Sequence, residues 1–305
     1  MSVSSGREAN VLSETPKPRV SLLVTDLDNT LWDWFHTWHT SFSALLSRLT
    51  ALSGVPQEQL ETEMRAVHRL RGTTAYSLLL DELPSLRERS RGRSPMQVYD
   101  EALHALNSAR KHTIGLYPGV RETLHFLRDR GVPVVAYTES ISFWSEWRMR
   151  NTGLDGLIDV MYSSPDHDFP RGTSPEDLRM YPNSEYDLKK TEHRQVPRGL
   201  LKPNKEVLRR ILDDFPVGPH ATVYIGDSLM KDVAMAQDFG VHDVHAAYGV
   251  SHDHEGYELL RRVSHWTQED IEREKTLAER PEVVPTRVAR QGFAELLDMF
   301  DFREV

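Results

Sequence analysis

The chain has 305 residues, of which 39% are hydrophobic, and it carries 37 basic against 46 acidic side chains, a formal net charge of -9. This length allows one large domain or two smaller ones with a sizeable core. The acidic balance argues against nucleic acid or an anionic membrane surface as the main partner. Cysteine is absent, which excludes disulfides, thiolate nucleophiles and cysteine metal sites.

The N-terminal segment, residues 1–19, has the composition of a flexible tail and lacks the apolar stretch of a secretory signal. No apolar run in the chain approaches the ~18 residues that a membrane span needs. We therefore expect no membrane association, and the cytoplasm is the expected compartment. The sequence holds no indication of the oligomeric state.

The first element after the tail is a short buried strand over residues 20–25, indicated by a continuous apolar run. Apolar and aromatic residues then recur at helical spacing from Trp34 onward. Two further helical stretches follow, near 58–71 and near 94–112, with a basic loop at 87–95 before the third. Residues 32–115 are therefore predicted to form a mostly helical module.

From residue 116 the chain alternates between helices and strands. A helix that carries Leu124 and Leu127 can end at Gly131. The later strands are predicted at 132–137, 159–164, 222–227 and 243–248, with helices at 141–151, 229–240 and around 293–300. Strands that alternate with helices imply right-handed βαβ units and a parallel sheet. The sequence thus predicts an α/β fold with a Rossmann-like parallel sheet and an inserted helical module.

Two segments differ from this pattern. Residues 164–199 are polar and rich in turns, so we expect a long insertion that is either a lid or a disordered loop. Residues 265–282 are highly charged and are predicted to form a solvated helix.

Polar residues that could take part in catalysis or ligand binding lie at or near the ends of the predicted strands. In an open parallel sheet, ligands bind beyond the carboxyl ends of the strands, so these side chains are expected to meet in one crevice. They are Asp26 and Asp28 after the first strand, Thr138 and Glu139 after the second, Asp227, Ser228 and Asp232 after a later one, and Lys202 before the helix that precedes it.

Several carboxylates in one pocket repel one another unless they share a cation. Oxygen ligands without cysteine suit Mg²⁺, which in turn can hold a phosphate oxygen. Thr138 can donate a hydrogen bond and Lys202 a point charge to the other phosphate oxygens. A carboxylate that faces such a phosphate can attack phosphorus. Because positions two apart share one face of an extended strand, a turn must follow Asp26 to separate it from Asp28.

Four stretches of the chain resemble the four motifs of the haloacid dehalogenase (HAD) superfamily. They are "DLDNT", the threonine of "VVAYT", the lysine of "LKP" and "GDSLMKD", which match in identity, order and strand context. The resemblance implies an α/β core over 20–31 and 116–305, including the 164–199 insertion, and a helical cap over 32–115. It also implies a phosphatase that hydrolyses the monoester of a small phosphorylated substrate through an aspartyl-phosphate.

By this resemblance Asp26 is the nucleophile and Asp28 the general acid and base, while Thr138 and Lys202 bind the transferring phosphoryl group. The cofactor implied is Mg²⁺, and Asp227 would ligate it together with the Asp26 carboxylate and the Asp28 backbone carbonyl.

The remaining candidates lie around these motifs. Asp232 is either a direct ligand of the metal or a support beside it, since a carboxylate in the first turn of a helix is also favoured by the helix dipole. Substrate binding is assigned to five residues: Asn29, Thr30, Trp32, Asp33 and Glu139. Glu139 departs from the small polar residue often seen at its position in the family, which leaves the substrate side of that loop open.

Other readings of the same residues remain open. A phosphomutase would use a bound sugar phosphate in place of water as the acceptor. In a dehalogenase Asp26 would attack carbon, but Asp28 argues against that branch, and a catalytically idle HAD-like binding protein is a further alternative. A zinc site is also conceivable, although the histidine spacing fits no strong zinc pattern; the histidines concerned are His36, His39, His242, His245, His252 and His254.

Overall fold

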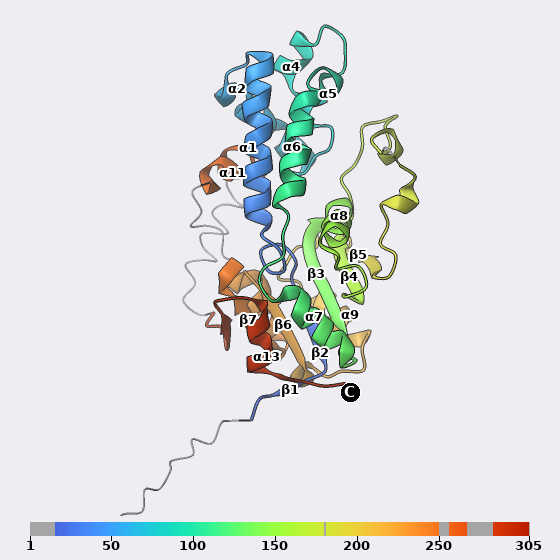
Figure 1. Cartoon of the computed structure of the whole chain (residues 1–305), viewed down its shortest axis with the longest axis vertical. Helices are drawn as coiled ribbons and strands as arrows, with labels where there is room; N and C mark the ends of the chain where they lie inside the picture. The colour runs from blue at the N-terminus through green and yellow to red at the C-terminus, as the bar shows by residue number, and fades with distance from the viewer. Residues whose placement is uncertain (1–15, 180, 250–255, 267–282, 305) are drawn as a thin grey trace, which may run out of the picture.

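A computed structural model describes residues 16–179, 181–249, 256–266 and 283–304 of the chain. Its centre is a sheet of seven parallel strands in the order β5-β4-β3-β2-β6-β7-β8 (Figure 1). The strands are β2 (Leu22–Thr25), β3 (Val134–Ile141), β4 (Val160–Ser164), β5 (Glu192–Gln195), β6 (Thr222–Gly226), β7 (His242–Ala246) and β8 (Val288–Ala289). The predicted α/β class with a Rossmann-like parallel sheet is confirmed.

Both faces of the sheet are covered because successive side chains of a buried strand point to opposite sides. In β2, Leu23 joins a cluster that includes residues of α7 (Val120–Asp129) and α13 (Leu296–Met299). Leu22 and Val24 join the cluster on the other face, with α9 (Lys205–Asp213) and α10 (Ala234–Asp238). This double burial explains why the strand is apolar at every position.

The chain between β2 and β3 forms a bundle of helices that we call the helical insertion. It consists of α1 (Trp34–Ser53), α2 (Gln57–Arg71), α3 (Leu79–Glu82), α4 (Pro84–Arg89), α5 (Pro95–Val98) and α6 (Asp100–Thr113). The long helices α1 and α6 stand side by side beyond the sheet (Figure 1). Two details differ from the prediction: the third helix is split at Tyr99, and the first part of the predicted loop at 87–95 is helical because Pro84 begins a turn of helix there.

A helix from the far end of the chain completes the core of the helical insertion. Leu259 and Val263 of α11 (Tyr257–Val263) belong to its apolar cluster, and α11 lies beside α1 and α2 in Figure 1. Nδ1 of buried His68 lies 2.6 Å from the Val263 carbonyl oxygen, and Arg262 pairs with Glu61 at 2.7 Å. The sequence alone assigns this segment to the α/β core.

The segment 164–199, predicted to be either a lid or a disordered loop, contributes a strand to the sheet. Its last part is β5, the edge strand of the sheet, and His193 fixes this strand to its neighbours. The His193 ring lies 2.7 Å from Ser163 Oγ and 2.7 Å from Glu146 of α8 (Ser142–Thr152). Earlier in the segment, Phe169 packs against the core of the helical insertion. The segment thus bridges the two parts of the molecule.

The remaining sequence predictions concern the ends of the chain. The predicted first strand is interrupted at Ser21, because β1 (Arg19–Val20) pairs instead with β9 (Asp301–Phe302) near the C-terminus. Residues 1–15 of the predicted tail, His252, His254 and most of the predicted helix at 265–282 lie outside the described residues. None of the helices in the described part of the chain combines the length and the apolar content that crossing a bilayer requires.

Candidate active site

A tight turn follows β2 and separates the two aspartates, as predicted. The amide groups of Thr30 and Leu31 both donate to the carbonyl of Leu27, at 3.2 and 2.8 Å. Asn29 has a φ of 58°, a left-handed conformation that asparagine tolerates better than most residues. As a result the carboxylates of Asp26 and Asp28 have different neighbours.

Asp26 faces a buried lysine. Lys202 Nζ lies 2.5 Å from Oδ1 of Asp26 and 2.8 Å from Oδ1 of Asp232, and the Thr30 hydroxyl donates to Oδ2 of Asp26 at 3.3 Å. The lysine is 3% exposed and lies over the rings of Tyr137 and Tyr224. One ammonium group therefore joins the first and the last of the four motifs.

The electrostatics of this cluster show an excess of negative charge. Burial raises the pKa of Asp26 to about 7, with Lys202 opposing and Asp232 adding to the rise. Burial, together with the charges of Asp26 and Asp232, also raises the pKa of Asp227 well above its usual range. For Lys202, burial lowers the pKa, but Asp232 and Asp26 outweigh it and the net shift is upward. One ammonium group does not balance three carboxylates.

This carboxylate cluster fits a divalent cation. Asp26, Asp227 and Asp232 each offer one oxygen, and the three oxygens lie within 4.8 Å of one another. An all-oxygen set suits a hard cation such as Mg²⁺, whose charge would offset the repulsion among the carboxylates. Among the described residues no histidine belongs to this cluster, and the Nε2 atoms of His242 and His245 each lie 3.0 Å from a backbone carbonyl oxygen.

Asp232 reaches the cluster because of a glycine and an unusual turn. The predicted helix at 229–240 begins as a π-helical turn, Leu229–Val233, before α10. A Cβ on Gly226 would lie 2.3 Å from Cγ of Asp232, so only glycine allows this approach. Asp232 also accepts hydrogen bonds from the Tyr224 hydroxyl at 3.0 Å and from the Ser228 amide at 3.2 Å.

Asp28 lies in a separate network in which every partner donates. The Trp32 indole donates to Oδ1 at 2.6 Å, the Ser140 hydroxyl donates to Oδ2, and Arg148 Nη1 lies 3.2 Å from Oδ1. Sequence reasoning missed Ser140 and Arg148. Ser140 follows the threonine motif by two positions, which was a usable signal, whereas the reach of Arg148 depends on how α8 packs.

The loop after β3 carries Thr138 and Glu139. The Thr138 hydroxyl oxygen accepts the Ser140 amide at 3.1 Å, which leaves its proton free to be donated. One Glu139 oxygen accepts the backbone amide of Lys202 at 2.7 Å, and the other lies 2.9 Å from Lys231 Nζ. In this arrangement Glu139 holds the lysine loop in place.

Three of the predicted substrate-binding residues have contacts within the protein. The Asn29 side chain accepts the Phe35 amide at 3.2 Å, and Asp33 caps α1 by accepting the His36 amide at 2.9 Å. Trp32 has no exposed surface and donates to Asp28. Its assignment to substrate binding stays a prediction.

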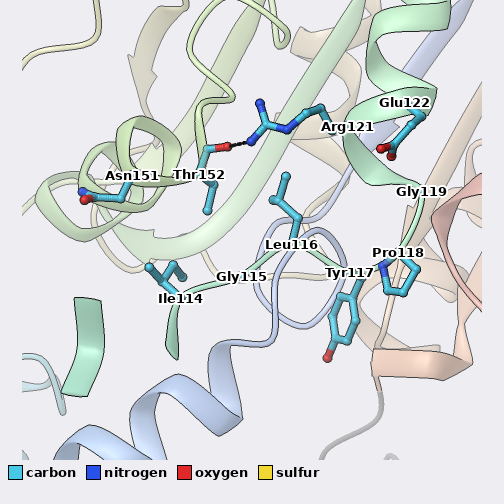
Figure 2. A pocket seen from close by; sticks show the side chains of 10 residues that line it. All are labelled: Ile114, Gly115, Leu116, Tyr117, Pro118, Gly119, Arg121, Glu122, Asn151 and Thr152. Carbon is cyan, nitrogen blue, oxygen red and sulfur yellow. Dashed lines mark hydrogen bonds between the residues drawn. The ribbon is translucent and has the colours of Figure 1, made fainter. Parts of the chain in front are cut away.

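A hollow of about 390 Å³ lies where α6 leads into α7 (Figure 2). The connecting residues 114–119 line it, with side chains of α7 and α8 opposite, and Arg121 donates to the Thr152 carbonyl across it. None of the motif residues is among its lining. This hollow is thus distinct from the carboxylate cluster.

Several solved structures are similar to this chain, and the first of those named here, with a TM-score above 0.5, supports the fold. A 2-haloacid dehalogenase from Pseudomonas syringae pv. Tomato DC3000 has a TM-score of 0.51 at 18% identity, covering 92% of this chain and 97% of that one. A predicted phosphoglycolate phosphatase from Haemophilus somnus 129PT has a TM-score of 0.47 at 16% identity, covering 92% and 97%. A HAD phosphatase from Thermococcus onnurineus has a TM-score of 0.44 at 17% identity, covering 79% and 97%.

Family models cover both segments that carry the motifs. No curated protein matches the chain. The model of the haloacid dehalogenase-like hydrolases matches residues 20–181, which is more than half of the chain and includes Asp26, Asp28 and Thr138. A HAD-hydrolase-like model matches residues 200–288, which include Lys202, Asp227 and Asp232. The chain therefore belongs to the haloacid dehalogenase-like hydrolase family.

Proposed function

We propose that this hydrolase cleaves the phosphate monoester of a small substrate, with Mg²⁺ as cofactor, through an aspartyl-phosphate on Asp26. The observation that supports this most is the convergence of three carboxylates and one buried ammonium group where β2 and β6 end. Such a site can hold a phosphoryl group between a cation, a lysine and a carboxylate nucleophile.

In the first half of the reaction an oxygen of Asp26 attacks phosphorus and the bond from phosphorus to the leaving oxygen breaks. Lys202 and the free hydroxyl proton of Thr138 would bind the equatorial phosphoryl oxygens. Asp28, once protonated, would give its proton to the leaving oxygen. For this step one of the hydrogen bonds that Asp28 now accepts must be lost, so that the freed oxygen can contact the leaving group.

In the second half, Asp28 as a carboxylate would take a proton from water while the water oxygen attacks phosphorus. The bond between phosphorus and Asp26 then breaks, and inorganic phosphate and the free carboxylate are the products. Asp26, Asp227 and the Asp28 backbone carbonyl would hold Mg²⁺, with Asp232 bound to it or supporting it. When bound, the cation supplies positive charge that offsets the charge developing on the phosphoryl oxygens.

The helical insertion would act as the cap that selects the substrate, since all four motifs lie outside it. The same holds for the 164–199 segment, which contacts both parts. The cytoplasmic compartment and the absence of nucleic acid and membrane partners stay predictions from the sequence. A dehalogenase would need no acid and base at position 28, so the presence of the Asp28 carboxylate there favours the phosphatase.

The test is a screen of phosphorylated metabolites and an aryl phosphate against the full chain, with release of phosphate as the readout. We expect turnover that EDTA abolishes and that Mg²⁺ restores. Ca²⁺ should not restore it, because Ca²⁺ takes more ligands at longer distances and can recruit both oxygens of Asp26. Full activity after EDTA treatment, or equal activity with Ca²⁺, would contradict the proposed site.

Two controls separate the alternatives in the same screen. Halide release from haloacids, without any release of phosphate, would identify a dehalogenase. Transfer of phosphate to a sugar phosphate in preference to water would identify a phosphomutase.

A further inference from the structure

Two arginines that the mechanism does not use lie where the helical insertion meets α8. Arg148 of α8 pairs with Asp28 and is only 11% exposed. Arg110, in the last turn of α6, has its guanidinium carbon 4.1 Å from the centre of the Trp144 ring. Trp144 also belongs to α8, and its indole donates to the Ala75 carbonyl of the helical insertion at 3.2 Å. The two arginines are thus held on facing parts of the molecule.

The charges of these arginines are not balanced. Burial, together with the positive charge of nearby Arg148, lowers the pKa of Arg110 to about 9. Among the described residues, no carboxylate forms an ion pair with Arg110, whose side chain donates only to Asn107 at 3.0 Å. The pair therefore sets two guanidinium groups against the single carboxylate of Asp28.

A structural explanation accounts for part of this arrangement. A cation in the last turn of a helix interacts favourably with the helix dipole, and an arginine over an indole ring gains a cation–π contact. Neither effect needs a half-buried guanidinium whose neighbour is a second guanidinium, Arg148. Lys111, the next residue along α6, is exposed and can serve the helix dipole without any such cost.

The position of the pair indicates what would balance it. Asp28 is the residue that would protonate the leaving oxygen, so Arg148 stands on the leaving-group side of the site. Guanidinium groups bind carboxylate and phosphate through two parallel hydrogen bonds. An anion between the two arginines would supply the missing negative charge.

We propose that Arg110 and Arg148 bind a second anionic group, carried by the leaving-group part of the substrate. The substrate class is then a phosphate monoester that bears a carboxylate or a second phosphate. This proposal rests on the proposed function for the identity of the ligand, but the binding of the anion can be tested without catalysis.

The first arm of the experiment measures binding by calorimetry, with phosphonates, which cannot be hydrolysed. Phosphonoacetate and its longer homologue phosphonopropionate are each compared with the amide in which an uncharged carboxamide replaces the carboxylate and the phosphonate is kept. Mg²⁺ is present in all measurements. We expect at least one acid to bind about 10–100-fold more tightly than its amide, the range of a charged hydrogen-bonded pair. Arg110→Gln should abolish this advantage, and the matched control Lys111→Gln should keep it.

The second arm measures phosphate release from phosphoglycolate, a diol bisphosphate and ethyl phosphate. Arg110→Gln should raise the KM of one or both anionic esters by about 10–100-fold and leave kcat/KM for ethyl phosphate within about twofold. Which anionic ester responds identifies the second group as carboxylate or phosphate. Arg110→Lys should recover part of the loss, because it restores the charge without the bidentate geometry.

The outcomes separate this proposal from the proposed function. Acids that bind no better than their amides, or an Arg110→Gln variant that loses activity equally on all three esters, would overturn the anion site. If the acids bind as expected but no ester is hydrolysed with Mg²⁺, the anion site stands and the phosphatase proposal fails.

Discussion

The α/β core and the helical insertion differ in the amount of buried charge that lacks compensation. At the carboxyl edge of the sheet, Asp26, Asp232 and Lys202 are all less than one-tenth exposed, and their charges do not cancel. In the helical insertion the buried residues are mainly aliphatic, and the buried polar groups that the structure describes there show no such excess of charge. Glu61 pairs with Arg262 and Nδ1 of His68 lies beside the Val263 carbonyl oxygen, while a few buried polar atoms, such as Thr50 Oγ1 and His68 Nε2, have no hydrogen-bond partner among the described residues.

This contrast separates two tasks. A site whose charges cancel only when a ligand arrives is suited to binding and chemistry, because its energy improves when the ligand is bound. A bundle with a mainly aliphatic core and no cluster of uncompensated charge is suited to holding a shape. The exception is Arg110, which lies over the Trp144 ring of α8. This residue belongs to the insertion, but we expect it to take part in substrate binding.

The largest loss of turnover is expected when the nucleophile of the α/β core is removed. Asp26→Asn keeps the shape of the side chain and should lower turnover by about 10⁵-fold or more, as loss of a covalent nucleophile does. Acid-quenched protein should carry no labelled phosphate. The exposed carboxylate of Asp100 in the insertion provides the control, since Asp100→Asn should keep full turnover. Label on the Asp26→Asn protein would contradict the assignment.

The next largest effect should follow from Asp28→Asn, which removes the general base but keeps the geometry. The water step should slow by about 10²–10⁴-fold, whereas an aryl phosphate, which has a good leaving group, hardly needs the acid. The phosphoenzyme should therefore accumulate in a burst near one equivalent, followed by slow turnover. Hydroxylamine lability of the trapped label identifies an acyl phosphate. Wild-type steady-state rates for this variant would rule out the role.

A cavity in the helical insertion should separate stability from chemistry. Leu49 of α1 has no exposed surface, and Leu49→Ala should cost about 2–5 kcal/mol of unfolding free energy. Turnover of an aryl phosphate well below the unfolding transition should stay within about threefold. Urea unfolding followed by tryptophan fluorescence gives the first quantity. A hundredfold loss of turnover with the fold intact would show that the insertion takes part in the chemical step.

A second effect on stability concerns pH and the helical insertion alone. Burial lowers the pKa of His68 from 6.5 to about 4, although the bond to Val263 opposes the shift. The unfolded chain therefore binds the proton first, so His68 makes stability fall as the pH drops from about 6.5 to about 4, by about 3 kcal/mol in all. Below that range its contribution is constant.

The measurement is the difference between two urea-unfolding series across this pH range, since carboxylates titrate in the same window. The wild-type protein should lose more stability than His68→Gln, which cannot take up the proton. His36→Gln, at an exposed position, should behave like the wild type. Identical pH profiles for wild type and His68→Gln would show that the histidine does not resist protonation.

Local patterns in the sequence were sufficient to predict most helices and strands and the position of the site along the chain. The apolar run of β2 and the helical spacing in α1 are local patterns, which survive in the fold because both are buried as their periods require. The residues at the ends of the strands were sufficient to predict that Asp26 and Asp227 meet at one edge, since parallel strands end on the same side. They were also sufficient to require the turn after Asp26.

Which side chains of the site pair with one another, and which segments surround them, follows from the tertiary structure alone. Lys202 lies between Asp26 and Asp232 rather than beside one of them, and Asp28 pairs with Arg148, a residue 120 positions away. The core of the insertion takes α11 from the other end of the chain, and the predicted loop at 164–199 supplies an edge strand. The physical reason is the same in each case: a periodic pattern fixes which face of an element is buried, but the partner of that face depends on packing between distant segments.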